Sequence, residues 1–84
     1  MLNEKQIKLA IDSKIRCLVQ HDSEKYSKGD LVKAYRRVLE SEIYDFIINV
    51  DSRLYLESIE YIFAAYDLEV EKGEDSMIKF ISRD

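Results

Sequence analysis

The chain has 84 residues, of which 46% are hydrophobic and 36% charged, and it contains two Gly, no Pro and no Trp. A chain of this length forms one domain, residues 1–84, and so few turn-forming residues favour long helices over a many-turned β-sandwich, while the apolar content excludes a disordered chain. The net charge of −4 hides an uneven distribution: residues 1–39 hold nine Lys or Arg and five Asp or Glu, whereas residues 40–75 hold two and eleven. The chain is therefore basic in its first half and acidic in its second.

The first predicted helix begins after Asn3. Asn3 is a favourable N-cap residue, and Gln6 stands where a capping box places its second side chain. Apolar residues then recur at the spacing of one helix face: Ile7, Ile11, Ile15 and Leu18. We expect this helix to end near Gln20, before the polar stretch HDSEKYSKGD.

Two more helices are predicted in residues 27–66. Ser27 and Asp30 repeat the capping pattern, and the apolar periodicity that follows predicts a second helix reaching about residue 48. The sequence NVDS interrupts it, so that Asp51 or Ser52 is expected to cap a third helix.

Residues 67–84 fit two structures. Leu68 and Val70 alternate with acidic residues, which predicts a β-hairpin of strands 68–71 and 77–81 joined by a turn around Gly73. The alternative continues the third helix to a stop at Gly73 and starts a short fourth helix at Asp75. We favour the hairpin, so the predicted fold is mainly α, with α+β as the variant: a three-helix domain followed by a C-terminal hairpin or short fourth helix.

The sequence contains little that indicates chemistry. Cys17 and His21 are the only Cys and His, and their spacing of four puts them on one side of a helix. Neither a closed metal site, which needs about four ligands, nor an activated Cys nucleophile has the further groups it requires. Gly29 and Gly73 stand alone, so there is no phosphate-binding loop. We therefore expect no enzyme activity, no metal and no cofactor.

Nucleic-acid binding is the alternative function. Three helices and a hairpin is the element order of a winged helix, and Lys33, Arg36 and Arg37 lie on the outward side of the second predicted helix. The third helix, which enters the major groove in that fold, carries acidic residues that phosphates would repel. Nucleic acid is therefore the less favoured partner.

Residues 42–67 hold more apolar and aromatic side chains than one helix face requires, which predicts a protein partner. The expected contact residues are acidic or aromatic: Tyr44, Tyr55, Glu57, Glu60 and Tyr61, with Glu40 and Asp45 at the rim. If the chain self-associates, a two-fold dimer is expected, through Ile47, Ile48, Ile62 and Phe63.

The sequence thus predicts a small non-catalytic regulator or inhibitor that docks an acidic, Tyr-bearing helical face on a protein with a basic surface. Its size and its Lys, Ile and Glu usage suggest a phage or mobile-element protein acting on a host nucleic-acid-binding protein, such as a defence or CRISPR component. A single free Cys fits a reducing cytoplasm, and no apolar run approaches the roughly 20 residues that span a bilayer. We therefore expect a cytoplasmic protein without membrane contact.

Overall fold

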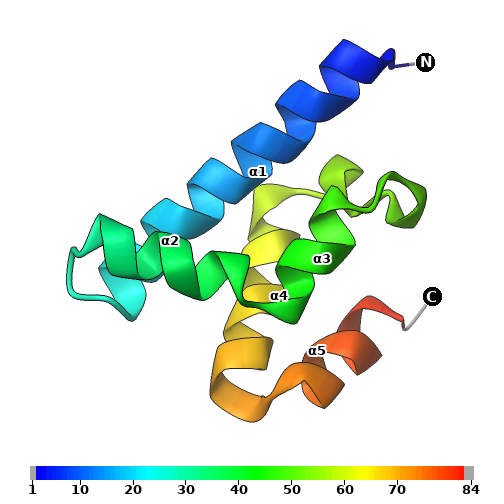
Figure 1. The fold of residues 1–84 in the computed structure, drawn as a ribbon. Helices are drawn as coiled ribbons and strands as arrows, with labels where there is room; N and C mark the ends of the chain where they lie inside the picture. The colour runs from blue at the N-terminus through cyan, green and yellow to red at the C-terminus, as the bar shows by residue number, and fades with distance from the viewer. Residues whose placement is uncertain (1, 83–84) are drawn as a thin grey trace.

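The computed structural model describes residues 2–82, and all regular structure in this range is helical (Figure 1). The α-helices are α1 (Glu4–Lys25), α2 (Leu31–Leu39), α3 (Glu42–Ile48), α4 (Ile59–Lys72) and α5 (Glu74–Ile81). Two short 3₁₀ helices, η1 (Val50–Ser52) and η2 (Leu54–Leu56), connect α3 to α4. The prediction of a mainly α protein is confirmed.

Helix α1 begins as predicted. The Asn3 side chain accepts a hydrogen bond from the Gln6 backbone N–H at 2.9 Å, and the Gln6 side chain accepts one from the Asn3 N–H at 3.0 Å. The helix continues to Lys25, past the predicted end at Gln20, because its polar residues near the end find partners inside the fold. Asp22 and Ser23 are both buried there.

The second predicted helix is two helices, and its predicted start is wrong. Asp30 caps α2 by accepting from the Lys33 N–H at 3.0 Å, whereas Ser27 donates its hydroxyl to Asp22. The chain leaves the helical conformation at Ser41, where α2 ends and α3 starts.

A carboxylate from α4 stabilises this break. Glu69 accepts hydrogen bonds from the backbone N–H groups of Glu42 and Ile43 at 2.7 and 2.9 Å, and Ser41 accepts from the Tyr44 N–H. The first N–H groups of α3 have no partner within their own helix, so these contacts remove the need for a continuous helix. Glu69 is 26 residues from Ile43, which is why local sequence does not reveal it.

The start of α4 also differs from the prediction. Ser58 caps this helix, through a hydrogen bond from the Tyr61 N–H at 3.1 Å, in place of Asp51 or Ser52. Residues 50–56 instead form η1 and η2, with Arg53 between them in the left-handed region at φ 58°. Ser52 holds this connection by donating its hydroxyl to the Phe46 carbonyl at 2.5 Å.

The predicted C-terminal hairpin is wrong, because residues 68–72 belong to α4 and residues 74–81 form α5. The alternative, a helix stop at Gly73 and a short further helix, is confirmed. Gly73 has a φ of 100°, a conformation that L-residues rarely adopt. Helix α5 turns back on α4, burying Met77 and stacking Phe80 on Tyr61 with ring centroids 5.0 Å apart. Packing of Met77 and Phe80 against α4 stabilises residues 74–81 as a helix. The alternation of Leu68 and Val70 therefore does not lead to a strand.

The core draws on every α-helix and on η2: Leu18, Val38, Ile43, Ile47, Leu54, Ile62, Ala65, Tyr66 and Met77. Helix α1 runs diagonally across the molecule, and its N-terminal part projects beyond the other helices (Figure 1). None of the helices in residues 2–82 is long and apolar enough to cross a membrane.

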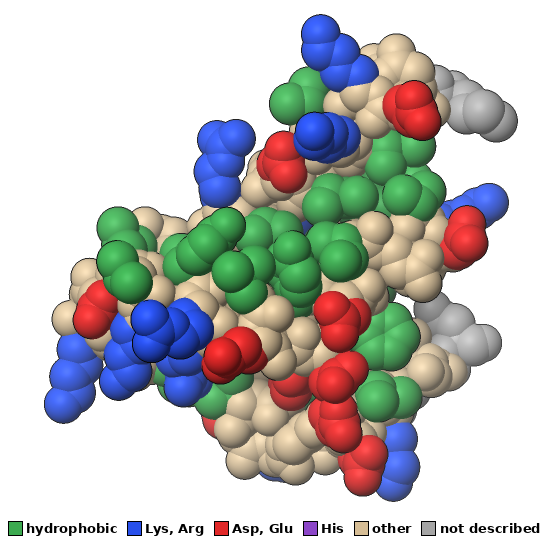
Figure 2. Space-filling model, viewed as in Figure 1, with side chains coloured by type: hydrophobic (Ala, Val, Ile, Leu, Met, Phe, Trp, Pro, Cys, Tyr) green, Lys and Arg blue, Asp and Glu red, His purple; other side chains and the backbone are tan. Residues whose placement is uncertain are grey.

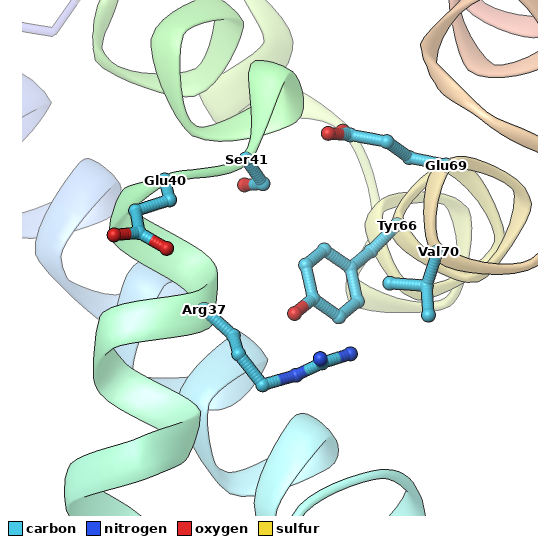
Figure 3. A pocket seen from close by; sticks show the side chains of 6 residues that line it. All are labelled: Arg37, Glu40, Ser41, Tyr66, Glu69 and Val70. Atoms are coloured by element: carbon cyan, nitrogen blue, oxygen red, sulfur yellow. The ribbon is translucent and has the colours of Figure 1, made fainter.

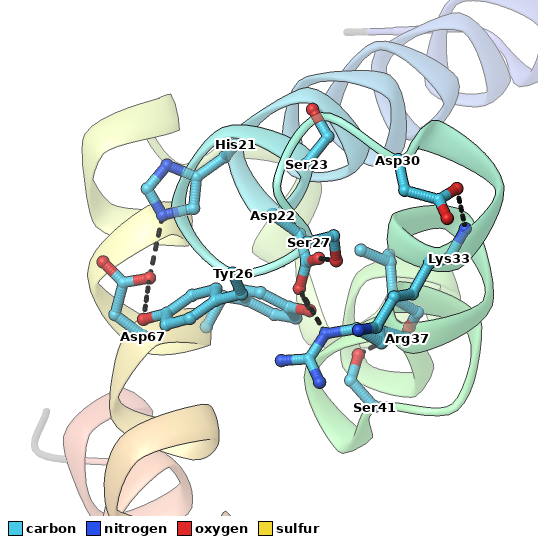
Figure 4. A network of polar contacts seen from close by, with 12 residues as sticks. His21, Asp22, Ser23, Tyr26, Ser27, Asp30, Lys33, Arg37, Ser41 and Asp67 are labelled. Atoms are coloured by element: carbon cyan, nitrogen blue, oxygen red, sulfur yellow. Dashed lines mark hydrogen bonds and ion pairs between the residues drawn. The ribbon is translucent and has the colours of Figure 1, made fainter.

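The Asp22 carboxylate joins three helices near the C-terminal end of α1 (Figure 4). It is fully buried and accepts hydrogen bonds from Ser27 Oγ at 2.5 Å, from Arg37 Nε of α2 at 3.0 Å and from the Tyr66 hydroxyl of α4. Burial alone would raise the pKa of Asp22, but the bonds from Ser27, Tyr66 and Arg37 outweigh it and hold the pKa below its usual value. Asp22 is therefore a buried carboxylate whose negative charge is stabilised by two hydroxyl groups and one guanidinium.

We expect Asp22→Asn to lower the free energy of unfolding by about 2 to 3 kcal/mol, because it places an amide N–H₂ among three donors and leaves Arg37 without its counter-ion. Urea unfolding followed by circular dichroism measures the effect. Glu24→Gln is the matched control, since Glu24 is exposed on the same helix, and it should change stability by less than about 0.5 kcal/mol. A carboxylate with a lowered pKa stabilises the fold fully above the unfolded value near 3.8 and less as the pH falls below it. Asp22→Asn should remove that part of the acid sensitivity, and equal effects of the two variants would contradict the assignment.

Candidate functional site

An apolar groove runs along α1, where this helix meets α2, α3 and the η1–η2 connection. It consists of four adjoining depressions that share lining residues. Its apolar residues are Leu2, Ile7, Ile11, Ile15, Val19, Leu31, Tyr35, Leu39, Tyr44, Ile48, Val50, Tyr55 and Leu56. Figure 2 shows it as a nearly continuous apolar surface across the middle of the molecule. We call this surface the α1 groove.

The α1 groove exists because the helices are apolar around more of their circumference than the core uses. Seven of its residues are large, apolar and exposed by 38 to 57% of their surface: Leu2, Leu31, Tyr35, Leu39, Ile48, Val50 and Leu56. The charged residues that line it are of both signs: Glu4, Lys5, Lys8, Asp12, Arg16, Asp51 and Arg53. The groove therefore combines an apolar floor with a mixed-charge border.

A second surface is acidic. Glu42 and Asp45 of α3, Glu69 of α4 and Glu74 of α5 lie close enough to interact, and we call them the acidic edge. Repulsion from Glu74, with smaller effects of burial and of Asp45 and Glu69, raises the pKa of Glu42 above its usual value. In Figure 2 the acidic side chains gather below the α1 groove. Negative charge is concentrated here although the carboxylates come from three helices.

A polar pocket of about 280 Å³ opens beside the acidic edge, between the end of α2 and α4 (Figure 3). Glu40 and Glu69 lie on opposite sides of it, and Arg37 and Tyr66 lie between them. The Arg37 guanidinium already pairs with buried Asp22, which raises the pKa of Arg37. The pocket therefore holds two carboxylates, Glu40 and Glu69, and one guanidinium whose charge is offset by Asp22 behind it.

The predicted partner-contact residues do not form one surface. Glu40 borders the pocket, Asp45 belongs to the acidic edge and Tyr44 lines the α1 groove. Tyr55 is only 7% exposed, and Tyr61 packs on Phe80.

Glu57 and Glu60 lie apart from these residues. Both are exposed at the start of α4. Glu69 is nine positions after Glu60 on α4, which corresponds to two and a half turns, so Glu60 faces away from the acidic edge.

The residues predicted for self-association are similarly divided. Ile47 and Ile62 are fully buried in the core, so no partner could reach them in the folded chain. Phe63 is half-buried and stacks on His21 at 4.2 Å between ring centroids. Only Ile48, 43% exposed in the α1 groove, is available to a partner.

His21 belongs to a structural network with Asp67 of α4. Asp67 accepts from His21 Nε2 at 2.8 Å, from Lys25 Nζ at 2.8 Å and from the Tyr26 hydroxyl at 2.9 Å. Burial opposes ionisation of Asp67, but these donors hold its pKa below the usual value, and burial with its acidic neighbours raises the pKa of Tyr26. Cys17 is half-buried and forms no hydrogen bond with His21. Within residues 2–82 no group of three or more His, Cys, Asp or Glu is placed to hold a metal ion.

The three cations of the nucleic-acid alternative are also unequal. Arg37 is committed to Asp22, whereas Lys33 and Arg36 are exposed on α2. The surface that could meet a phosphate backbone is therefore smaller than the sequence suggested.

Asp22, Asp67 and Glu69 were missed as organising residues by the sequence-based analysis. One signal was available for Asp22: it follows Leu18 by four residues and so lies on the apolar face of the first helix. Asp67 and Glu69 carry no comparable local signal, because all their partners are distant in sequence.

Comparisons with protein-family models, with curated proteins and with solved structures find no match to this chain.

Glu74→Gln tests the acidic edge. We expect the pKa of Glu42 to fall toward its usual value, because Glu74 is the largest source of the repulsion that raises it. Titration of the side-chain carboxyl resonances by NMR gives this pKa directly. Glu60→Gln removes the same charge from the other side of α4 and should leave the pKa of Glu42 unchanged. If both variants shifted the pKa of Glu42 equally, the assignment of Glu42 and Glu74 to one acidic edge would be contradicted.

Proposed function

We propose that this protein is a non-catalytic regulator or inhibitor that docks its acidic edge on the basic surface of another protein. The observation that carries the proposal is the meeting of four carboxylates from three helices at one edge of the fold, where Glu69 of α4 binds the start of α3 and Glu74 of α5 lies next to Glu42. A nucleic-acid-binding protein has the complementary surface, since it is built to meet phosphates. A host defence protein, with the chain supplied by a phage or mobile element, is one partner of this class.

The acidic edge has charge available for a partner. Within the described residues the ion pairs lie elsewhere and involve Asp22, Asp67 and Glu71 as the acids. Carboxylates that face each other without cations between them attract an approaching positive surface and speed its association. This attraction weakens as salt is added.

The pocket beside the edge provides an anchor for one cationic side chain. The C-terminal end of α2, which carries partial negative charge, lies at Glu40. The pocket has a volume of about 280 Å³, which is enough for a Lys or Arg side chain between Glu40 and Glu69. Because two backbone N–H groups hold Glu69, its carboxylate is in place before a partner arrives.

A fluorescent oligolysine peptide is the probe for this proposal, with binding followed by anisotropy at low and moderate salt. The double variant Glu42→Gln with Glu74→Gln should bind roughly tenfold more weakly than the unaltered chain, because it removes half of the carboxylates of the acidic edge. Added salt should reduce the difference.

The matched control is Glu57→Gln with Glu60→Gln, which changes the net charge equally at another surface. This control should keep most of the affinity. Equal losses in the two double variants would show that the peptide senses only net charge, and the proposed docking edge would then be abandoned.

A further inference from the structure

We infer that the α1 groove is a self-association surface, on which two copies of the chain pack with their α1 helices antiparallel about a two-fold axis. The inference concerns a different surface from the acidic edge, so each can fail without the other. Its evidence is the size of the apolar area and the order of the charges along α1.

The area fits one half of a stable interface. The exposed parts of the seven large apolar residues amount to somewhat more than three fully exposed side chains, on the order of 600 Å². Apolar patches on monomers reach about 300 to 600 Å², so this is at the upper limit. A standard interface buries about 800 Å² on each partner and is slightly more than half apolar, which needs roughly 450 Å². One groove therefore supplies what a dimer requires.

The charges that border the groove on α1 are self-complementary. Glu4, Lys8, Asp12 and Arg16 follow one another at intervals of four residues, so they form one row with alternating sign. In an antiparallel pair centred on residue 10, Glu4 of one copy faces Arg16 of the other, and Lys8 faces Asp12. Two-fold symmetry repeats each pair, so every charge of the row meets an opposite charge.

The charges of this row are not committed to ion pairs with described residues of their own chain. The N-terminal part of α1 also projects beyond the other helices (Figure 1), and all four charged residues are exposed. The groove lining as a whole holds four cations and three anions, so the net negative charge of the chain is not located on this face.

Light scattering or sedimentation equilibrium across a dilution series tests the inference. The unaltered chain should be a dimer that dissociates on dilution, and Ile48→Glu should raise the dissociation constant at least tenfold by placing charge on the groove floor. Ala64→Glu is the matched control: Ala64 is exposed on α4 and lines none of the four depressions of the groove, so this variant should dimerise normally. A chain that is monomeric at every concentration would overturn the inference.

Charge exchange tests the antiparallel arrangement. Lys8→Glu alone should weaken the dimer, because it sets Glu against Asp12 twice, and Asp12→Lys alone should do so by setting Lys against Lys8. An equimolar mixture of the two variants should recover a heterodimer of near-normal affinity, since each mismatch is then corrected across the interface. Circular dichroism confirms that each variant is folded. A dimer that neither single variant weakens, or a mixture that does not recover, would rule out this pairing of α1 helices.

Discussion

The fold depends on one buried carboxylate. Asp22 is fully buried, and burial of an ionised carboxylate is unfavourable unless hydrogen-bond donors surround it. The fold must therefore place Ser27, Arg37 and Tyr66 next to Asp22. Meeting that requirement sets the turn after α1, the path of α2 along α1 and the position of α4 behind them. The α2 part of the α1 groove lies beside the α1–α2 contact that Asp22 and Arg37 join.

The two candidate surfaces differ in the forces they would use. The α1 groove is large, apolar and nearly neutral at its border, so burial of apolar area would dominate there and salt would matter little. The acidic edge accumulates carboxylates from three helices, so long-range attraction would dominate. Their separation on the molecule allows one copy of the chain to use both at once.

Sequence reasoning succeeded where the information was local. The Asn3 cap, the start of the first helix and the mainly α class follow from side chains within a few residues of one another, whereas the stop at Gly73 belonged to the alternative that was not favoured. It failed where a distant residue decided the outcome: Glu69 ends the long second helix at Ser41, and the packing of Met77 and Phe80 on α4 makes residues 74–81 helical. The surplus of apolar residues was predictable, but its place was not, since Ile47 and Ile62 turned inward and the exposed surplus gathered along α1.

The Glu69 side chain has two structural roles, and a substitution at this position would change both. Its carboxylate holds the first N–H groups of α3, a helix of seven residues that is too short to persist without help, and the same carboxylate lines the pocket next to the acidic edge. A ligand that drew Glu69 toward itself would loosen the start of α3, and with it Glu42 and Asp45. Recognition and local order are therefore linked through one side chain, so natural variation at this position is expected to be narrower than at the other acidic residues of the surface.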